Sequence, residues 1–146
     1  MNRQQLRYVV VQDPTRVAYI NEHVHFAALL GKASAFQKSH YSPVYIGIIQ
    51  THPHPYSDLD TGIAADTIKV TASSLGLGSC ILASFKDVDE VCEIKDQEVL
   101  RVLIAIVHPA HQSTIVPVQK SLAYYQDEQH HFYVPKKALS KIVTIL

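Results

Sequence analysis

Residues 98–109, EVLRVLIAIVHP, place the strongest constraint on what this chain can fold into. Successive side chains of a strand point to opposite faces, and in this run nearly all of them are apolar. A strand with this pattern is buried on both faces. We therefore expect it to lie in the interior of a sheet that is covered by a further layer on each side. A chain of 146 residues has room for one such core, which predicts a single domain over residues 1–146.

Strand-like and helix-like segments alternate before this run. Residues 6–12, LRYVVVQ, predict a buried strand, and Asp13 and Pro14 then predict the cap and the first residue of a helix that continues to Gly31. Residues 44–50, VYIGIIQ, predict a second apolar strand, which the stiff sequence THPHPYSD brings to an end. The first part of the chain therefore follows the order strand, helix, strand.

A long central helix is predicted from residue 59 to residue 75. Asp66 and Lys69 fall away from the side of this helix on which apolar or small residues recur at helical spacing. The recurring positions are Ala64, Ile68, Ala72 and Leu75. Gly76 or Gly78 can take the left-handed conformation that ends a helix, and the run SCILASF then predicts an edge strand or a connecting segment.

The remaining segments complete a layered order. Asp87 and Glu90 are spaced as in a capping box, which predicts a short helix over residues 87–94. Strands and helices then alternate up to the central strand, and this order predicts an α+β or α/β three-layer sandwich. The apolar tail IVTIL either pairs with the sheet of its own chain or reaches a partner subunit, because an exposed apolar edge would aggregate.

Composition narrows the class of protein. The 13 Lys and Arg residues balance the 13 Asp and Glu residues, so no overall field attracts nucleic acid or an anionic membrane. No segment has the length of a membrane helix, and the first residues lack the apolar core of a signal peptide. Cys80 and Cys92 both lie in apolar surroundings, which favours buried, reduced thiols without a bridge. A cytoplasmic location is the expectation.

The nine histidines raise the question of a metal site. Eight of them occur in four close pairs, and such pairs can begin a zinc-binding set. The pairs are His23 with His25, His52 with His54, His108 with His111, and His130 with His131. No Cys or carboxylate joins them at a spacing typical of zinc, so we expect surface or singly hydrogen-bonded histidines and no metal.

The junction GLGSCILASF, residues 76–85, carries more information than its composition suggests. Taken alone, a helix that ends in Gly-x-Gly before an apolar run is most often a simple helix terminus. It is not a dinucleotide-binding fingerprint, because these glycines follow a helix instead of opening one after a strand. The neighbouring segments decide how the junction is interpreted.

Residues 60–85, DTGIAADTIKVTASSLGLGSCILASF, resemble the flavin-dependent nitroreductase family. In that family a central helix of the form Asp-x-Gly-x-Ala ends in Gly-Leu-Gly-x-Cys. The later runs VLIAIVHPA and KKALSKIV continue the resemblance, and the start MNRQQLRYVVVQD is similar to the family's Asn-x-Gln segment and first core strand. The resemblance covers most of the chain and implies a nitroreductase-like fold, with a central, mostly antiparallel sheet flanked by helices.

The resemblance also implies a function. Members of the family bind FMN as homodimers, with two flavin sites at the subunit interface, and pass electrons from NAD(P)H to nitro-aromatic compounds, quinones or similar acceptors. Because the flavin supplies the redox chemistry, no catalytic side chain is needed. The alternative is a dimeric remnant of the fold that binds flavin poorly or not at all and acts as a binding or structural module.

The resemblance assigns the redox edge of the flavin to one segment. Residues 81–85 correspond to the segment whose backbone lies along the isoalloxazine ring, so Ile81 is a predicted contact. Ala83 and Ser84 correspond to the positions nearest the reactive N5 atom. Backbone N–H groups aimed at N5 stabilise the reduced ring without a special side chain, which explains why Ala is tolerable there.

Four further cofactor-binding residues follow from the resemblance. Asn2 matches the family's asparagine that hydrogen-bonds the pyrimidine end of the flavin, and Gln4 matches a nearby glutamine. Lys136 falls where the family contacts the ribityl phosphate, and Lys137 is a second candidate for this contact.

The family's sequence begins upstream of the asparagine segment, with a helix and an Arg-Ser-x-Arg arm that grips the flavin. The present sequence starts at the asparagine segment, so the resemblance implies an N-terminally short member without this arm. Two missing arginine contacts would cost roughly 3–6 kcal/mol of binding free energy. We therefore expect FMN affinity to be weaker than is usual in the family.

Overall fold

The computed structural model describes residues 3–26, 41–109, 113–129 and 131–145. These residues belong to two compact units, each described separately below. The first unit contains residues 3–26 and 41–108, and the second contains the described residues from 109 onwards. The expectation of a single domain stays a prediction.

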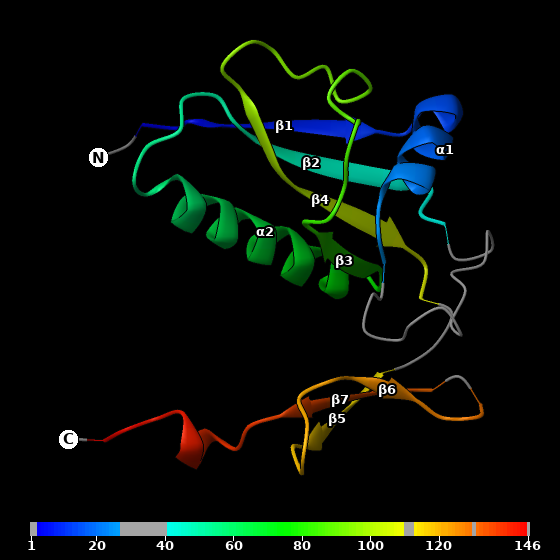
Figure 1. Cartoon of the computed structure of the whole chain (residues 1–146), viewed down its shortest axis with the longest axis vertical. Helices are drawn as coiled ribbons and strands as arrows, with labels where there is room; N and C mark the ends of the chain where they lie inside the picture. Colours follow the sequence, from blue (N-terminus) through cyan, green and yellow to red (C-terminus); the bar gives the residue numbers. More distant parts are fainter. Residues whose placement is uncertain (1–2, 27–40, 110–112, 130, 146) are drawn as a thin grey trace. The chain divides into compact units, whose positions relative to one another are not determined.

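The first unit is built on a four-stranded antiparallel sheet (Figure 1). Its strands are β1 (Leu6–Val11), β2 (Val44–Gln50), β3 (Gly78–Leu82) and β4 (Val99–Val107), in the spatial order β1-β2-β4-β3. The predicted central strand is confirmed, because β4 pairs with β2 on one side and with β3 on the other.

Two helices belong to this unit. Helix α1 (Pro14–His23) begins as predicted, with the Asp13 carboxylate accepting hydrogen bonds from the N–H groups of Thr15 and Arg16. Helix α2 (Ser57–Ser74) is the predicted long helix. Gly76, with φ of 73°, takes the left-handed conformation that ends it.

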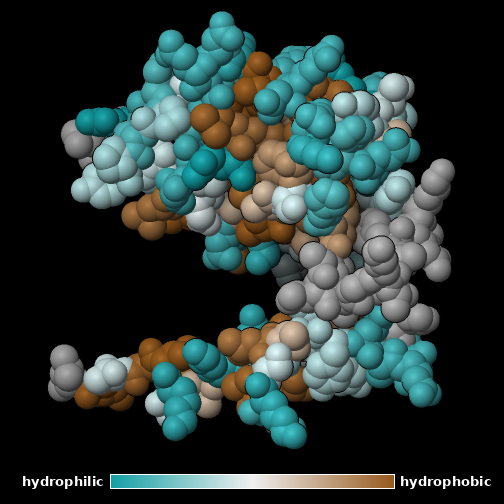
Figure 2. Space-filling view, in the orientation of Figure 1, coloured by the Kyte–Doolittle hydropathy of each residue, from teal (hydrophilic) through white to brown (hydrophobic). Residues whose placement is uncertain are grey.

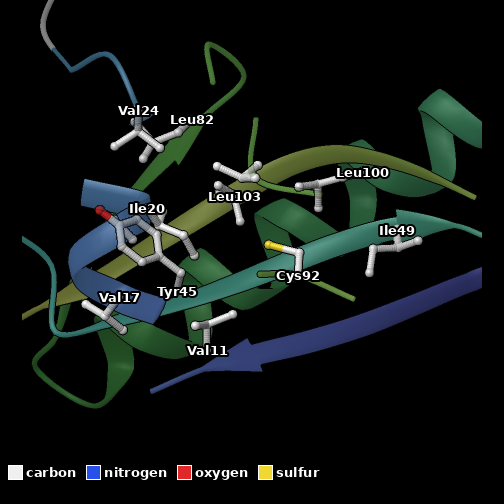
Figure 3. Close-up of a cluster of buried hydrophobic side chains, with 12 residues drawn as sticks. Val11, Val17, Ile20, Val24, Tyr45, Ile49, Leu82, Cys92, Leu100 and Leu103 are labelled. Carbon is white, nitrogen blue, oxygen red and sulfur yellow. The ribbon is translucent and has the colours of Figure 1, made fainter. Parts of the chain in front are cut away.

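One face of the sheet packs against α1 and the segment that follows β3 (Figure 3). Val17 and Ile20 of α1 meet Tyr45 and Leu103 from the interior strands, and Cys92 completes the cluster. Ile20, Tyr45, Leu103 and Cys92 are fully buried. Burial of one large aliphatic side chain contributes about 1.5–3 kcal/mol, so this cluster fixes α1 on the sheet.

The other face of the sheet packs against α2. Ile48 of β2 and Ile104 of β4 are fully buried against Ala65. Small residues on this side of α2 let the helix axis approach the strands closely. The sheet therefore lies between α1 and α2, as the layered prediction requires.

The second unit contains a small three-stranded sheet. Its strands are β5 (Ser113–Pro117), β6 (Tyr125–Gln126) and β7 (Phe132–Lys136), with β7 parallel to β5 and antiparallel to β6. A short 3-10 helix, η3 (Leu139–Lys141), follows. The described part of the apolar tail, residues 142–145, forms no strand, so its contact with a partner subunit stays a prediction.

The predicted helix over residues 87–94 is wrong. The segment forms consecutive turns, and Asp87 has a φ of 56°, whereas a residue that caps the start of a helix has a negative φ. Val88 and Cys92 are drawn into the core instead, so tertiary packing overrides the local capping signal. The first predicted helix is also too long, because α1 ends at His23 and Val24 pairs with Phe85; residues 27–31 lie outside the described residues.

Three burial predictions are corrected as well. Strand β1 is an edge strand whose Tyr8 and Val10 side chains are exposed, not a buried strand. Leu75 is exposed at the end of α2, and Cys80 is exposed on β3, which is the other edge of the sheet. Both thiols are free, as expected.

The predicted α+β class, with helices flanking an antiparallel central sheet, is confirmed. Among the described residues, none of the helices is long and apolar enough to cross a membrane.

Candidate flavin site

The antiparallel pairing brings four chain segments to one end of the first sheet. Leu6, at the start of β1, pairs with Gln50 at the end of β2, and Gln50 pairs with Val99 at the start of β4. The end of β3 lies on the same side, because Leu82 pairs with Leu103. The segment before β1 and the segment after β3, which both carry predicted site residues, therefore leave the sheet at the same end.

The segment after β3 presents its outer face to solvent. Leu82 points into the core, whereas Ile81, Ala83 and Ser84 are exposed. The carbonyl oxygen of Ser84 accepts a hydrogen bond from the N–H of His25 at 3.0 Å, which fixes the segment to the chain after α1. Among the described residues, the hydrogen bonds outside the strand ladders do not use the N–H groups of Ala83 or Ser84. These two donors are available to a ligand.

A cavity of about 450 Å³ lies beside this segment, between α2 and the strand ends. Its volume is within the range of about 300–1,000 Å³ that is typical of ligand sites. Its lining residues are Asp58, Thr61, Gly62, Ala65, Ile81, Ala83, Arg101 and Val102. A Cβ atom built on Gly62 would meet no other atom within 4 Å, so the cavity is open on the helix side.

A group of polar side chains lies at the α2 end of the cavity. The Arg101 guanidinium donates a hydrogen bond to Asp58 Oδ1 at 2.5 Å. The buried Gln50 amide donates to the same oxygen at 3.1 Å and to Thr61 Oγ1 at 2.9 Å. The hydrogen bonds from Gln50 and Arg101 lower the pKa of the Asp58 carboxyl, so this group stays ionised.

The segment before β1 contains an unsatisfied acceptor. Gln5 Oε1 is buried and has no hydrogen-bond partner among the described residues. The Gln5 carbonyl oxygen accepts hydrogen bonds from the N–H and the hydroxyl of Thr51, so the segment is tied to the end of β2. An orphaned amide oxygen costs free energy unless a ligand or water satisfies it, which is consistent with a polar ligand at this end of the sheet.

The chemistry of these groups fits a flat ring with one polar edge. Ala65, Ile81 and Val102 supply apolar wall, and the Ala83 and Ser84 N–H groups and Arg101 supply donors. Within the described ranges, no group of three or more His, Cys, Asp or Glu side chains is placed to hold a metal ion.

The structure brings together only part of the predicted site. Ile81, Ala83 and Ser84 are adjacent, and Ile81 and Ala83 line the same cavity. Gln4 is exposed in the segment before β1, with a φ of 48°, and Asn2 lies outside the described residues. Lys136 and Lys137 are exposed in the second unit, and their part in a flavin site stays a prediction.

Asp58 and Arg101 are cavity residues that the sequence interpretation missed. The sequence contains a signal for Arg101, because it is the only charged residue in residues 99–107, a strand that is otherwise apolar on both faces. A charge at such a position is costly unless it has a partner. The partner Asp58 could not be read from the sequence, because it lies 43 positions earlier, on α2.

Comparisons with known proteins agree with this architecture. The model of the nitroreductase family matches residues 1–107. A search of curated proteins found no match.

Solved structures with the same fold come from several bacteria. A nitroreductase family protein from Clostridium novyi NT is 22% identical, with a TM-score of 0.60 over 74% of this chain and 64% of that chain. An FMN-dependent nitroreductase from Clostridium difficile R20291 is 21% identical, with a TM-score of 0.54 over 74% of this chain and 65% of that chain. A nitroreductase family protein from Streptococcus pneumoniae TIGR4 is 16% identical, with a TM-score of 0.66 over 98% of this chain and 80% of that chain.

The chain thus spans slightly less than two thirds of the length of the first two of these structures. The family match covers the whole four-stranded sheet, both helices and the segment after β3. This chain belongs to the nitroreductase family.

Proposed function

We propose that the protein is an FMN-dependent oxidoreductase that takes electrons from NAD(P)H and passes them to nitro-aromatic compounds, quinones or similar acceptors. The observation that carries the proposal is the segment of Ile81, Ala83 and Ser84, whose exposed face adjoins an open, mostly apolar cavity. The FMN-dependent neighbour from Clostridium difficile supports the choice of cofactor.

The chain's own residues have a limited task in this proposal. FMN supplies the electron-transfer chemistry when it is bound. Ile81 would lie against the ring, and the N–H groups of Ala83 and Ser84 would donate hydrogen bonds toward its N5 atom. Asn2 and Gln4 would hold the pyrimidine end, and Lys136 and Lys137 would neutralise the phosphate.

The proposal includes a homodimer with flavin sites at the interface. Helix α2 exposes a stripe of apolar side chains on the side away from the sheet, with Leu59, Ile63 and Val70 each about 60% exposed. A groove of about 380 Å³ continues this stripe to Leu6 and Tyr8 of the edge strand. Monomeric proteins rarely expose a contiguous apolar surface of this kind, so a second copy is the proposed cover.

Binding of FMN tests the proposal directly. The purified chain is titrated with FMN while flavin fluorescence and the melting temperature of the protein are measured. Quenching and a raised melting temperature are expected, because a ligand that binds only the folded state stabilises it. If millimolar FMN changes neither quantity, the oxidoreductase proposal is wrong and the flavin-free dimeric remnant is favoured.

A pair of variants localises the binding. Ile81→Asp places a carboxylate against the ring and should weaken FMN binding by at least about tenfold. Tyr19→Asp is the control, because Tyr19 is also 39% exposed but lies on α1, at the opposite face of the sheet. Equal affinities of the two variants would contradict the assignment.

Once FMN is bound, the electron donor is identified by measuring oxidation of NADH and of NADPH with a quinone or nitro-aromatic acceptor.

A further inference from the structure

The register between β2 and β4 contains an irregularity at Arg101. Ile48 pairs with Val102 and Ile49 pairs with Leu100, so the residue between them on β4 has no partner on β2. This arrangement is a β-bulge, and bulges next to functional sites commonly re-aim a side chain. Here the bulge lets Leu100 enter the core while the Arg101 side chain reaches α2.

Arg101 is held against α2 by a short hydrogen-bond network. Asp58 accepts its hydrogen bond, and the buried Gln50 amide fixes Asp58 while also donating to Thr61. Thr61 in turn donates its hydroxyl hydrogen to the Ser57 carbonyl oxygen at 2.8 Å. The guanidinium is therefore held by groups that belong to the rigid first turns of a helix and the end of an interior strand.

The guanidinium keeps spare hydrogen-bonding capacity. It carries five N–H donors in a fixed planar arrangement. Within the part of the chain that the structure describes, Asp58 is the only group to which Arg101 donates. Asp58 is 71% exposed, so water screens much of its opposing charge.

Arg101 also shares its cavity with the proposed redox segment. The cavity is lined by Arg101 and Asp58 at its polar end and by Ile81 and Ala83 on the β3 side. A ligand that contacts Ala83 inside this cavity is within reach of the guanidinium.

We propose that Arg101 is a flavin-binding residue that donates to the polar edge of FMN and favours its reduced, anionic form over its oxidised form. The inference rests on the proposed function, and it adds a cation at a bulged strand position to the contacts already proposed. The physical reason is that negative charge increases on the ring when it is reduced, and a prepositioned donor stabilises that charge.

The experiment compares the reduction potential of bound FMN in the wild-type chain with that in Arg101→Ala and Arg101→Lys. Arg16→Ala is the control, because Arg16, on α1, forms an ion pair with Glu93 and does not line the cavity. Affinity for oxidised FMN is measured by fluorescence, and the potential is measured against a reference dye. Asp58 is exposed, so the removal of Arg101 leaves no buried charge and the variant should fold.

Loss of Arg101 should weaken binding of reduced FMN about tenfold more than binding of oxidised FMN. A tenfold change of this kind lowers a two-electron potential by about 30 mV. The Lys variant should recover part of the difference, and the Arg16 variant should match the wild type. If the Ala variant binds FMN with the wild-type potential, the inference is overturned while the proposed function stands; if the wild type binds no FMN, the proposed function fails.

Discussion

At the residue scale, long-range polar contacts fix the segment after β3. Arg7 of β1 donates two hydrogen bonds to the Glu98 carboxylate and one to the Glu93 carbonyl oxygen. The N–H of Lys95 donates to the same carboxylate. The Arg7 and Lys95 hydrogen bonds lower the pKa of Glu98 to about 2. One carboxylate thus holds an otherwise irregular segment against the edge strand.

Glu98→Gln should make stability less dependent on pH. Because its pKa is lower in the folded protein, Glu98 stabilises the fold above its ordinary pKa, and this contribution is lost as the pH falls toward 2. The free energy of unfolding of the wild type should therefore exceed that of the variant above about pH 5, and the two should converge in acid. Urea denaturation at several pH values measures this difference. Glu22→Gln, on the exposed side of α1, is the control, and a constant difference across the range would contradict the assignment.

At the element scale, some helices and strands are determined by residues that are close in sequence, and others by packing against distant strands. The Asp13 cap, the β2 range and the glycine that ends α2 were all predictable, because they depend on residues close in sequence. The helix over residues 87–94 was predicted wrongly, since Val88 and Cys92 are buried by contacts with distant strands.

Substitution by alanine should have opposite effects on stability at Gly62, inside α2, and at Gly76, just after it. Gly62→Ala should stabilise the protein by about 0.5–1 kcal/mol, because Gly62 is inside the helix and its new Cβ would meet no atom within 4 Å. Gly76→Ala should destabilise it by about 1–2 kcal/mol, because its φ of 73° is unfavourable for a residue with a Cβ. Thermal denaturation of both variants measures the two signs. Destabilisation by both would show that Gly62 is not in open space.

The candidate site was predictable only where it lies on a continuous segment. Ile81, Ala83 and Ser84 follow directly from the junction after α2, and they do lie together. Arg101 and Asp58 meet through a bulge in β4 and the packing of α2, and neither is encoded in a local motif. The small sheet of the second unit was also missed, because its strands are short and β7 contains Pro135, which argues against a strand.

At the scale of the whole molecule, the exposed stripe of α2 and the edge strand β1 leave apolar surface for a second copy. Ile63→Glu should raise the dimer dissociation constant by at least about tenfold, because it buries a charge at the proposed interface. Analytical ultracentrifugation over a range of protein concentrations measures this change. Tyr19→Glu, on the other side of the sheet, should leave assembly unchanged. A wild-type chain that is monomeric at high concentration would contradict the proposed homodimer.

We propose above all that FMN binds against the chain immediately after β3. Two-dimensional amide NMR during an FMN titration tests it most directly, because the Ala83 and Ser84 N–H groups are the proposed donors. We expect these two resonances and that of Ile81 to shift saturably with FMN, while those of residues 17–20 on α1 stay in place. Saturation of the protein with FMN without a shift at Ala83 or Ser84 would contradict it.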